Sequence, residues 1–218
     1  MNIDFSLYIN LDFRTDRKDH MEKQLVGCSW PVERLSATRL AVSPESLGMT
    51  MHPRLVGHKG VASIWLSHKD ALEKFSAING SGGYLLLEDD VAIASTFWTS
   101  KKDYLKGLPS DWEVVLLSPR YRYRRPEDAS PEEQGKRLAK SPNGDAPVFL
   151  PQAAKKYIIT GAHFCIFRNK MVVDKVLEKL KSSAQVCDVD NFYVVNFKTY
   201  GIRCSEIGTA GFSSDHNV

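Results

Sequence analysis

Short apolar runs rich in β-branched and aromatic residues alternate along the chain with stretches of helical periodicity. Residues 5–11 (Phe-Ser-Leu-Tyr-Ile-Asn-Leu) form the first apolar run. Residues 15–26 follow as a predicted helix, with Thr15 or Asp16 as its cap. Because a strand followed by a helix is the repeating unit of proteins with a mostly parallel sheet, the pattern predicts an α/β fold.

The middle of the chain repeats this alternation most clearly. Over residues 61–75, apolar or amphipathic side chains recur in steps of three or four, which predicts a helix: Val61, Ile64, Trp65, His68, Leu72 and Phe75. Residues 84–87 are apolar on both faces, as expected of a central strand that is covered from both sides. This predicted strand ends abruptly in Glu88-Asp89-Asp90.

The second half of the chain contains an unusual polar segment. A predicted helix at 97–105 and a strand at 112–117 precede residues 119–147, which contain five prolines and many charges. We interpret 119–147 as a long surface excursion. Loops of that length are usually functional or mobile. Strands are predicted again at 157–160 and 162–168, then a helix at 170–181 and an edge strand at 201–206. No linker divides the chain, so we expect one domain over residues 1–218.

Composition narrows the class of protein. The chain has 218 residues, 43% of them hydrophobic, and a formal net charge of +3, which is too balanced to indicate a nucleic-acid partner. No apolar stretch approaches the roughly 20 residues of a transmembrane helix, and the N-terminus lacks the pattern of a signal peptide. We therefore expect a soluble cytoplasmic protein.

The acidic triplet Glu88-Asp89-Asp90 is the strongest candidate site. The carboxyl ends of strands in an open α/β sheet are where ligands bind. Three adjacent carboxylates repel one another unless a cation compensates, and hard oxygen ligands favour Mg²⁺ or Mn²⁺. A metal held in this way typically bridges the protein to a diphosphate. The alternative is a solvated acidic turn.

Four further residues carry candidate chemistry. Asp188 and Asp190 flank Val189 at a predicted helix entry, where either could cap the helix or act as a general base. His68 lies on the apolar stripe of its helix, where a core role is the simpler interpretation. His216 lies in a polar C-terminal tail that could fold back and complete a metal shell.

Cationic residues near the start of the chain suggest phosphate binding. Asn10 closes the first strand, and Arg14 and Arg17 flank the start of the next helix. No GxGxxG or GxxxxGK[ST] string is present, which argues against a dinucleotide oxidoreductase and a P-loop NTPase. The segment 120–125 alternates arginine with tyrosine and could contact a sugar acceptor, stack bases, or be a solvated loop.

Taken in order, these strings resemble glycosyltransferase family 25, which includes bacterial lipooligosaccharide glycosyltransferases and collagen galactosyltransferases. The matching strings are Tyr8-Ile9-Asn10-Leu11-Asp12 with Arg14, Asp16 and Arg17; Arg34-Leu35-Ser36-Ala37; Leu66-Ser67-His68; Leu87-Glu88-Asp89-Asp90-Val91; and the region of Asp188 and Asp190. Two features depart from the family. Ser63-Ile64 stands where the family usually has Gly-Cys, and the 119–147 excursion has no counterpart.

The resemblance implies a GT-A type fold, an α/β/α domain that binds a nucleoside diphosphosugar. It implies that Glu88 and Asp90 are the outer members of an Asp-x-Asp metal motif, to which His216 could add a further ligand if the tail folds back, and that the reaction inverts the anomeric centre. It also implies the following nucleotide-sugar-binding residues: Asn10, Leu11, Arg14, Arg17, Ser67, His68 and Asp89.

The sequence therefore predicts a hexosyltransferase dependent on Mn²⁺ or Mg²⁺. The donor is a nucleoside diphosphosugar, with UDP as the expected nucleotide, and the acceptor is a hydroxyl of a glycan or glycoprotein, as in lipopolysaccharide biosynthesis. Asp190, or else Asp188, would be the catalytic base. The alternatives are a metal-dependent nucleotidyltransferase and a non-catalytic module that binds carbohydrate or nucleic acid.

Overall fold

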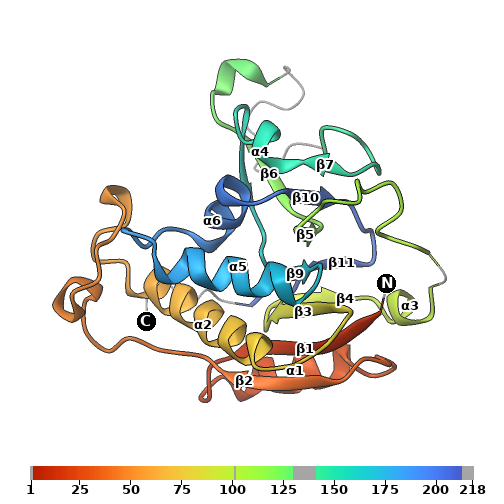
Figure 1. Cartoon of the computed structure of the whole chain (residues 1–218), viewed down its shortest axis with the longest axis horizontal. Helices are drawn as coiled ribbons and strands as arrows, with labels where there is room; N and C mark the ends of the chain where they lie inside the picture. Colours follow the sequence, from red (N-terminus) through yellow and green to blue (C-terminus); the bar gives the residue numbers. More distant parts are fainter. Residues whose placement is uncertain (1, 101, 130–140, 213–218) are drawn as a thin grey trace.

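A computed structural model describes residues 2–100, 102–129 and 141–212 of the chain (Figure 1). The strands are β1 (Ile3–Asn10), β2 (Val32–Ser36), β3 (Gly83–Glu88), β4 (Val91–Ile93), β5 (Val114–Leu117), β6 (Arg120–Tyr123), β7 (Val148–Phe149), β8 (Tyr157–Thr160), β9 (Phe164–Phe167), β10 (Thr199–Ile202) and β11 (Ile207–Thr209). The α-helices are α1 (Thr15–Gln24), α2 (Lys59–Ser76), α3 (Ser95–Thr99), α4 (Leu150–Ala153), α5 (Lys170–Lys181) and α6 (Val189–Asn196). Short 3-10 helices occupy Pro44–Leu47, Pro53–Leu55 and Pro126–Asp128.

The described elements build a central 7-stranded sheet in the order β2-β1-β3-β9-β5-β10-β7. Strands β2, β1, β3, β5 and β10 run in one direction, and β9 and β7 run against them. The sheet is therefore mostly parallel. Two small two-stranded sheets, β4 with β11 and β6 with β8, flank it.

Apolar clusters lie on both faces of this sheet, as the sequence of β3 requires. Tyr84 and Leu86 join the cluster that contains residues of α2, α5 and α6, whereas Leu85 and Leu87 join the cluster with Met21 of α1. In Figure 1, α2 and α5 lie side by side on one face of the sheet. The predicted α/β fold class, with helices on both faces of the sheet, is thus confirmed.

The helix predicted at 61–75 is confirmed as α2. Of its predicted apolar stripe, Trp65, His68, Leu72 and Phe75 are buried, and Val61 and Ile64 are partly buried. The predictions at 157–160 and 170–181 coincide with β8 and α5. The expected cap of α1 is wrong, because Arg14 occupies the N-cap position and makes no side-chain capping bond.

Three expectations for the chain after residue 96 are also wrong. The helix expected at 97–105 ends at Thr99. The strand expected at the sheet edge over 201–206 is β10, which lies between β5 and β7. Residues 120–123 are not loop but strand β6, paired antiparallel with β8.

The alternation of arginine with tyrosine explains β6. A strand points successive side chains to opposite sides, so Tyr121 is buried while Arg120 and Arg122 remain exposed. Residues 130–140 of the expected excursion lie outside the described residues. Across the described part of the chain, no helix is both long and apolar enough to cross a bilayer. The single-domain boundary and the cytoplasmic location remain predictions.

Candidate active site

The candidate site forms where strands β1 and β3 end and strand β9 begins. Ile9 of β1 pairs with Glu88 of β3, and the backbone N–H of Glu88 donates to the carbonyl of His163, 3.1 Å away. Parallel neighbours end at the same edge of a sheet, so the acidic triplet meets Asn10 there. The sequence thus brings two segments that are far apart in the chain to one edge.

Asp89, the middle residue of the triplet, points into the protein. Its carboxylate accepts a hydrogen bond from Asn10 Nδ2 at 2.8 Å and forms an ion pair with Arg17 at 2.7 Å. Asp89 and Arg17 are both buried. In the structure they bind each other, tie α1 to the end of β3 and line the first pocket, and the contact with a nucleotide sugar that the resemblance implies for both remains a prediction.

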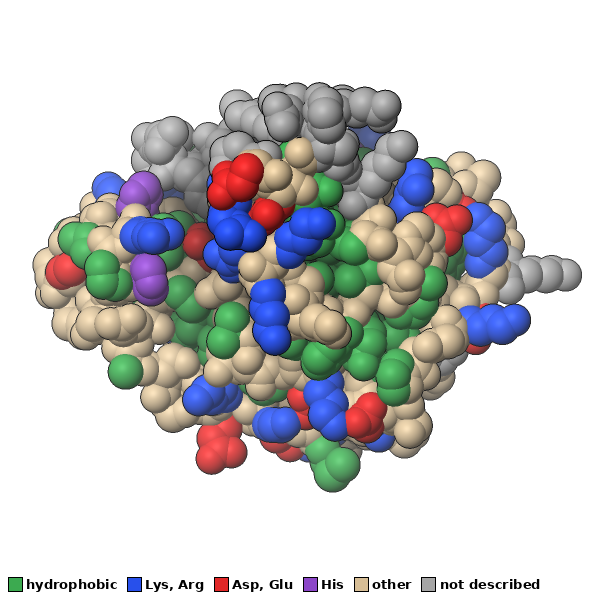
Figure 2. Space-filling model, turned by 90° about the horizontal axis from the view of Figure 1, so that it is seen from above, with side chains coloured by type: hydrophobic (Ala, Val, Ile, Leu, Met, Phe, Trp, Pro, Cys, Tyr) green, Lys and Arg blue, Asp and Glu red, His purple; other side chains and the backbone are tan. Residues whose placement is uncertain are grey.

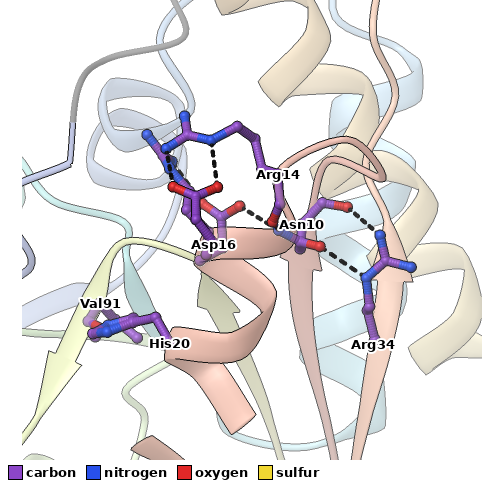
Figure 3. A network of polar contacts seen from close by, with 8 residues as sticks. Asn10, Arg14, Asp16, His20, Arg34 and Val91 are labelled. Atoms are coloured by element: carbon purple, nitrogen blue, oxygen red, sulfur yellow. Dashed lines mark hydrogen bonds and ion pairs between the residues drawn. The ribbon is translucent and has the colours of Figure 1, made fainter. Parts of the chain in front are cut away.

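Asn10 continues this network toward β2. Its side-chain oxygen accepts a hydrogen bond from Arg34 Nε at 2.9 Å, and its Nδ2 also donates to the carbonyl of Arg14 at 3.1 Å. Figure 3 shows Asn10 between Arg34 and the loop that carries Arg14, whose guanidinium pairs with Asp16 at 2.8 Å. Arg14 and Arg17 also lie over the ring of Phe212, at 5.9 and 5.3 Å from its centroid. These contacts hold the loop between β1 and α1 against the end of β1.

Glu88, the first residue of the triplet, is contacted from the face of the sheet that α2 covers. His68 Nε2 lies 3.3 Å from a carboxylate oxygen of Glu88, and His68 Nδ1 lies 2.8 Å from the hydroxyl of Tyr193. The side chain of His68 is fully buried, whereas that of Glu88 is 28% exposed. The burial of His68 agrees with its interpretation as a core residue. Its polar contact with Glu88 was not predicted.

Asp90, the last residue of the triplet, is in a different state from Asp89. Its Oδ1 is buried and has no hydrogen-bond partner among the described residues. Burial first, and then the negative charge of Glu88, raise the pKa of Asp90 to about 6. A carboxylate in such surroundings gains from a bound cation.

Asp190 lies across from the triplet, in the first turn of α6. Its carboxylate accepts a hydrogen bond from the backbone N–H of Ala162 at 2.6 Å. Burial and the charge of Glu88 raise the pKa of Asp190 to about 6. Asp188, by contrast, is exposed at the N-cap of α6, where it makes no side-chain capping bond.

Two pockets meet at this edge. The first, of about 210 Å³, is lined by Asn10, Leu11, Arg17, Thr38, Arg39, Lys59, Ser67, His68, Glu88, Asp89 and Asp90, among others. The second, of about 460 Å³, is lined by Glu88, Asp90, Arg120, Arg122, Thr160, His163, Asp188 and Asp190, among others. Ile64, Glu88 and Asp90 line both. The two pockets therefore share an acidic wall.

The remaining predicted residues divide as follows. Leu11 and Ser67 line the first pocket, and the Ser67 hydroxyl accepts the backbone N–H of Thr38 at 2.9 Å. Arg14 pairs with Asp16 near the end of β1 and is not among the residues that line the two pockets. His216 lies outside the described residues. The ligand and catalytic roles assigned from the sequence therefore remain predictions.

The sequence reasoning missed two residues of the second pocket and its surroundings. The side chain of His163 is buried, and both ring nitrogens have no hydrogen-bond partner among the described residues. Burial lowers the pKa of His163 to about 4, so the ring is neutral at pH 7. Tyr193 was also missed, although it follows Asp190 by one helical turn, a spacing that places both on one face.

The basic side chains of residues 120–125 do not form an isolated cationic patch. Arg125 pairs with Asp128 at 3.0 Å, and Arg120 lies in the wall of the second pocket with the acidic residues. On the face seen in Figure 2, Lys and Arg side chains are spread among Asp, Glu and apolar side chains.

The side chains that could act as metal ligands fit a divalent cation only in part. In the described part of the chain, no group of three or more His, Cys, Asp or Glu side chains is arranged to hold a metal ion. Glu88 and the buried oxygen of Asp90 nevertheless supply hard carboxylate ligands. Mg²⁺ is usually bound through one or two carboxylates together with substrate phosphates. The residues therefore fit a cation that a bound diphosphate helps to hold.

Comparison with known proteins gives distant similarities. No family model matches the chain. A protein of Acanthamoeba polyphaga mimivirus, provisionally named glycosyltransferase R655, is 28% identical over 116 residues, which are 51% of this chain and 36% of that protein. The aligned part thus spans little more than a third of the relative.

Two solved structures illustrate the structural similarities. A197 from STIV has 17% identity and a TM-score of 0.47, covering 97% of this chain and 87% of that one. A glycosyltransferase involved in glycosylation of the major capsid of PBCV-1 has 10% identity and a TM-score of 0.42, covering 84% and 68%. The chain is therefore similar in sequence to a provisionally named glycosyltransferase, and family 25 is not singled out.

Proposed function

We propose that the chain is a glycosyltransferase of the GT-A type. It would transfer a hexose from a nucleoside diphosphosugar, with UDP as the expected nucleotide, to a hydroxyl of a glycan or glycoprotein. The observation that carries the proposal is the pair of pockets that share Glu88 and Asp90 in one wall. A transferase needs two ligand sites that meet at the reacting atoms. The mimivirus relative supports the same class of reaction.

The first pocket suits the donor. Arg39 and Lys59 contribute positive charge to its walls, and Asn10 and Thr38 contribute polar groups at the end of the sheet. Diphosphates are recognised by such cationic and polar groups. The acidic wall would repel a bare diphosphate, so the donor and a cation are expected to bind together.

Glu88 and Asp90 are the residues that would hold Mn²⁺ or Mg²⁺, with His216 of the C-terminal tail as a predicted further ligand. When bound, such an ion neutralises charge on the departing diphosphate. The protein's own contribution is the placement of two carboxylates at the junction of the pockets. Burial of Asp90 Oδ1 without a partner among the described residues supports this role, because an unpaired buried carboxylate is costly.

The second pocket suits the acceptor, with Asp190 as the base. In a single in-line displacement, the acceptor oxygen forms a bond to the anomeric carbon as the bond from that carbon to the diphosphate oxygen breaks. The electron pair leaves with the diphosphate, the proton of the acceptor hydroxyl passes to Asp190, and the anomeric centre inverts. A base with its pKa raised to about 6 holds a proton better than an ordinary aspartate does. Asp188, exposed on the pocket rim, is the weaker candidate.

A thermal-shift screen tests donor and metal binding. Nucleoside diphosphosugars are added with Mn²⁺ or with EDTA, and the melting temperature is recorded. A ligand at 100 times its Kd stabilises the native state by about 2.7 kcal/mol. We expect a UDP-hexose to raise the melting temperature only with Mn²⁺, and Asp90→Asn to abolish the rise.

Asp145→Asn is the matched control, because Asp145 is an exposed carboxylate, 3.8 Å from Arg203, that lines neither pocket. It should respond to donor and metal as the wild type does. A UDP-hexose shift of equal size in EDTA would contradict the proposed metal dependence, and the absence of a shift with every donor would contradict the proposed donor pocket.

A further inference from the structure

A buried polar chain connects helix α6 to the end of strand β3 through helix α2. The hydroxyl of Tyr193 lies 2.8 Å from His68 Nδ1, and His68 Nε2 lies 3.3 Å from Glu88 Oε1. Tyr193 and His68 are both fully buried. His68 and Glu88 both line the first pocket, but of the three side chains only that of Glu88 is partly exposed.

The chemistry of the three groups sets the direction of the hydrogen bonds. An ionised carboxylate only accepts, so His68 Nε2 must carry the proton and donate to Glu88. In a neutral imidazole the other nitrogen then has a lone pair, which accepts from the hydroxyl of Tyr193. Each ring nitrogen of His68 is thereby engaged within the protein.

The position of Tyr193 is itself tightly defined. Its ring packs against Phe167 of β9, with centroids 5.7 Å apart, and its backbone carbonyl accepts the hydroxyl of Thr199 at 2.7 Å. A rigid hydroxyl at one end of the chain restricts rotation of the imidazole, and the imidazole restricts the carboxylate. Residues placed behind a functional group in this way fix its orientation.

We propose that His68 and Tyr193 are positioning residues, which hold Glu88 so that its carboxylate is presented to the shared wall of the two pockets. The inference rests on the proposed function, because it assumes that Glu88 acts on a bound metal and donor. It changes the role that the family resemblance implies for His68. The imidazole acts through Glu88, and its nitrogens do not contact the nucleotide sugar.

Two substitutions of His68 separate positioning from simple packing. His68→Gln keeps an amide N–H near the place of Nε2, where it can still donate to Glu88. His68→Asn keeps a polar group near the place of Nδ1, facing Tyr193, but is too short to reach Glu88. We expect crystal structures to show Glu88 in its wild-type rotamer in the Gln variant and displaced in the Asn variant.

Tyr193→Phe removes only the hydroxyl, and Tyr84→Phe is its matched control. Tyr84 is also fully buried, but its hydroxyl donates to the carbonyl of Ile78 at 2.9 Å, away from both pockets. Both variants lose one buried hydrogen bond, so their stability should fall by similar amounts. Only Tyr193→Phe should change the site.

The functional readout is Mn²⁺ affinity in the presence of UDP, followed by electron paramagnetic resonance of the free ion. Substitution of residues that orient a metal ligand typically lowers metal affinity 10- to 100-fold. We expect a loss of about 10-fold for His68→Asn, a smaller loss for Tyr193→Phe, near wild-type affinity for His68→Gln, and no change for Tyr84→Phe.

The two readouts distinguish the inference from the proposed function. If the wild type binds no Mn²⁺ with UDP, the metal-dependent function is contradicted, whereas the rotamer of Glu88 still decides whether His68 and Tyr193 position it. An unmoved Glu88 in His68→Asn would overturn the inference whatever the metal affinity. Equal loss of Mn²⁺ affinity in the Gln and Asn variants would also overturn it.

Discussion

The two pockets share one acidic wall but differ in how their polar side chains are paired. Around the first pocket, Asp89 is bound by Asn10 and Arg17, and Asn10 is bound in turn by Arg34. On the wall that both pockets share, Asp90 Oδ1 is buried without a partner among the described residues, and in the second pocket so are both ring nitrogens of His163. Paired groups stabilise a fold, whereas unpaired buried groups cost free energy.

This difference assigns different work to neighbouring residues. Asp89 and Asp90 are adjacent in sequence, yet Asp89 is held by Asn10 and Arg17, whereas Asp90 Oδ1 has no partner among the described residues and is proposed to meet a ligand. Native proteins break the rule of polar pairing mainly at functional sites, where the cost is recovered on binding. The second pocket is therefore where we expect the chemistry, supported by the rigid frame under the first.

The largest expected effect comes from breaking the frame. Arg17→Leu leaves the buried carboxylate of Asp89 without its cation and should lower the free energy of unfolding by about 3 kcal/mol, measured by urea denaturation. Lys18→Ala, one position along α1, is the control. Lys18 is 46% exposed and lies 3.7 Å from Glu22, so its removal should cost less than about 0.5 kcal/mol. Equal effects would show that the Arg17 pair is not a structural support.

The next effect is a pH dependence from Asp190. Its pKa is raised by burial to about 6 in the folded state, against an ordinary value of 3.8, so the folded state binds the proton more tightly. This contribution to stability is complete below about pH 4 and is lost as the pH rises through 6. Asp190→Asn should therefore gain stability relative to the wild type by about 2 kcal/mol between pH 4 and pH 7, measured in EDTA.

A stability difference that does not change over that pH range would contradict the account of Asp190. Since Asp90 also has its pKa raised to about 6, the double variant Asp90→Asn with Asp190→Asn should flatten the pH profile further.

The smallest expected effect is on the free energy of unfolding of two histidine variants. His163→Leu removes two unpartnered buried nitrogens and should raise the free energy of unfolding by about 1 kcal/mol at pH 7. His20→Leu should lower it by about 1 kcal/mol, because His20 Nε2 hydrogen-bonds the carbonyl of Val91 at 2.8 Å (Figure 3). Calorimetric melting of both variants checks the pair. A destabilised His163→Leu would show that the ring has packing or bonding partners that outweigh the unpaired nitrogens.

Local patterns were enough to predict much of the fold. The 3.6-residue period of α2 and the doubly apolar β3 are properties of short segments, and so is the position of Glu88-Asp89-Asp90 at a strand end. Strand β6 was not predicted because the segment around it is rich in prolines and charges, which favour a loop. The two-residue alternation of residues 120–123 is short by comparison. The place of β10 inside the sheet depends on pairing with distant strands, which no local pattern contains.

The residue types of the candidate site were predictable from the sequence, but the partners of each residue were not. Asp89 and Asp90 are identical in sequence terms, and what separates them is Asn10 and Arg17, which lie more than 70 positions earlier in the chain. Likewise His68 meets Tyr193 across 125 positions, so the link from Tyr193 through His68 to Glu88 depends on the packing of α2 against α6. His163 gave no sequence signal, because its importance lies in the partners that it lacks among the described residues.

The most direct test of the account is product analysis with the two aspartate variants of the second pocket. Wild type, Asp190→Asn and Asp188→Asn are incubated with Mn²⁺, a UDP-hexose and a panel of glycan acceptors, and the products are identified by liquid chromatography and mass spectrometry. The account predicts UDP and a new glycoside from the wild type, a rate at least 100-fold lower in Asp190→Asn with unchanged donor affinity, and a nearly normal rate in Asp188→Asn. Full activity of Asp190→Asn, or release of pyrophosphate in place of UDP, would contradict it.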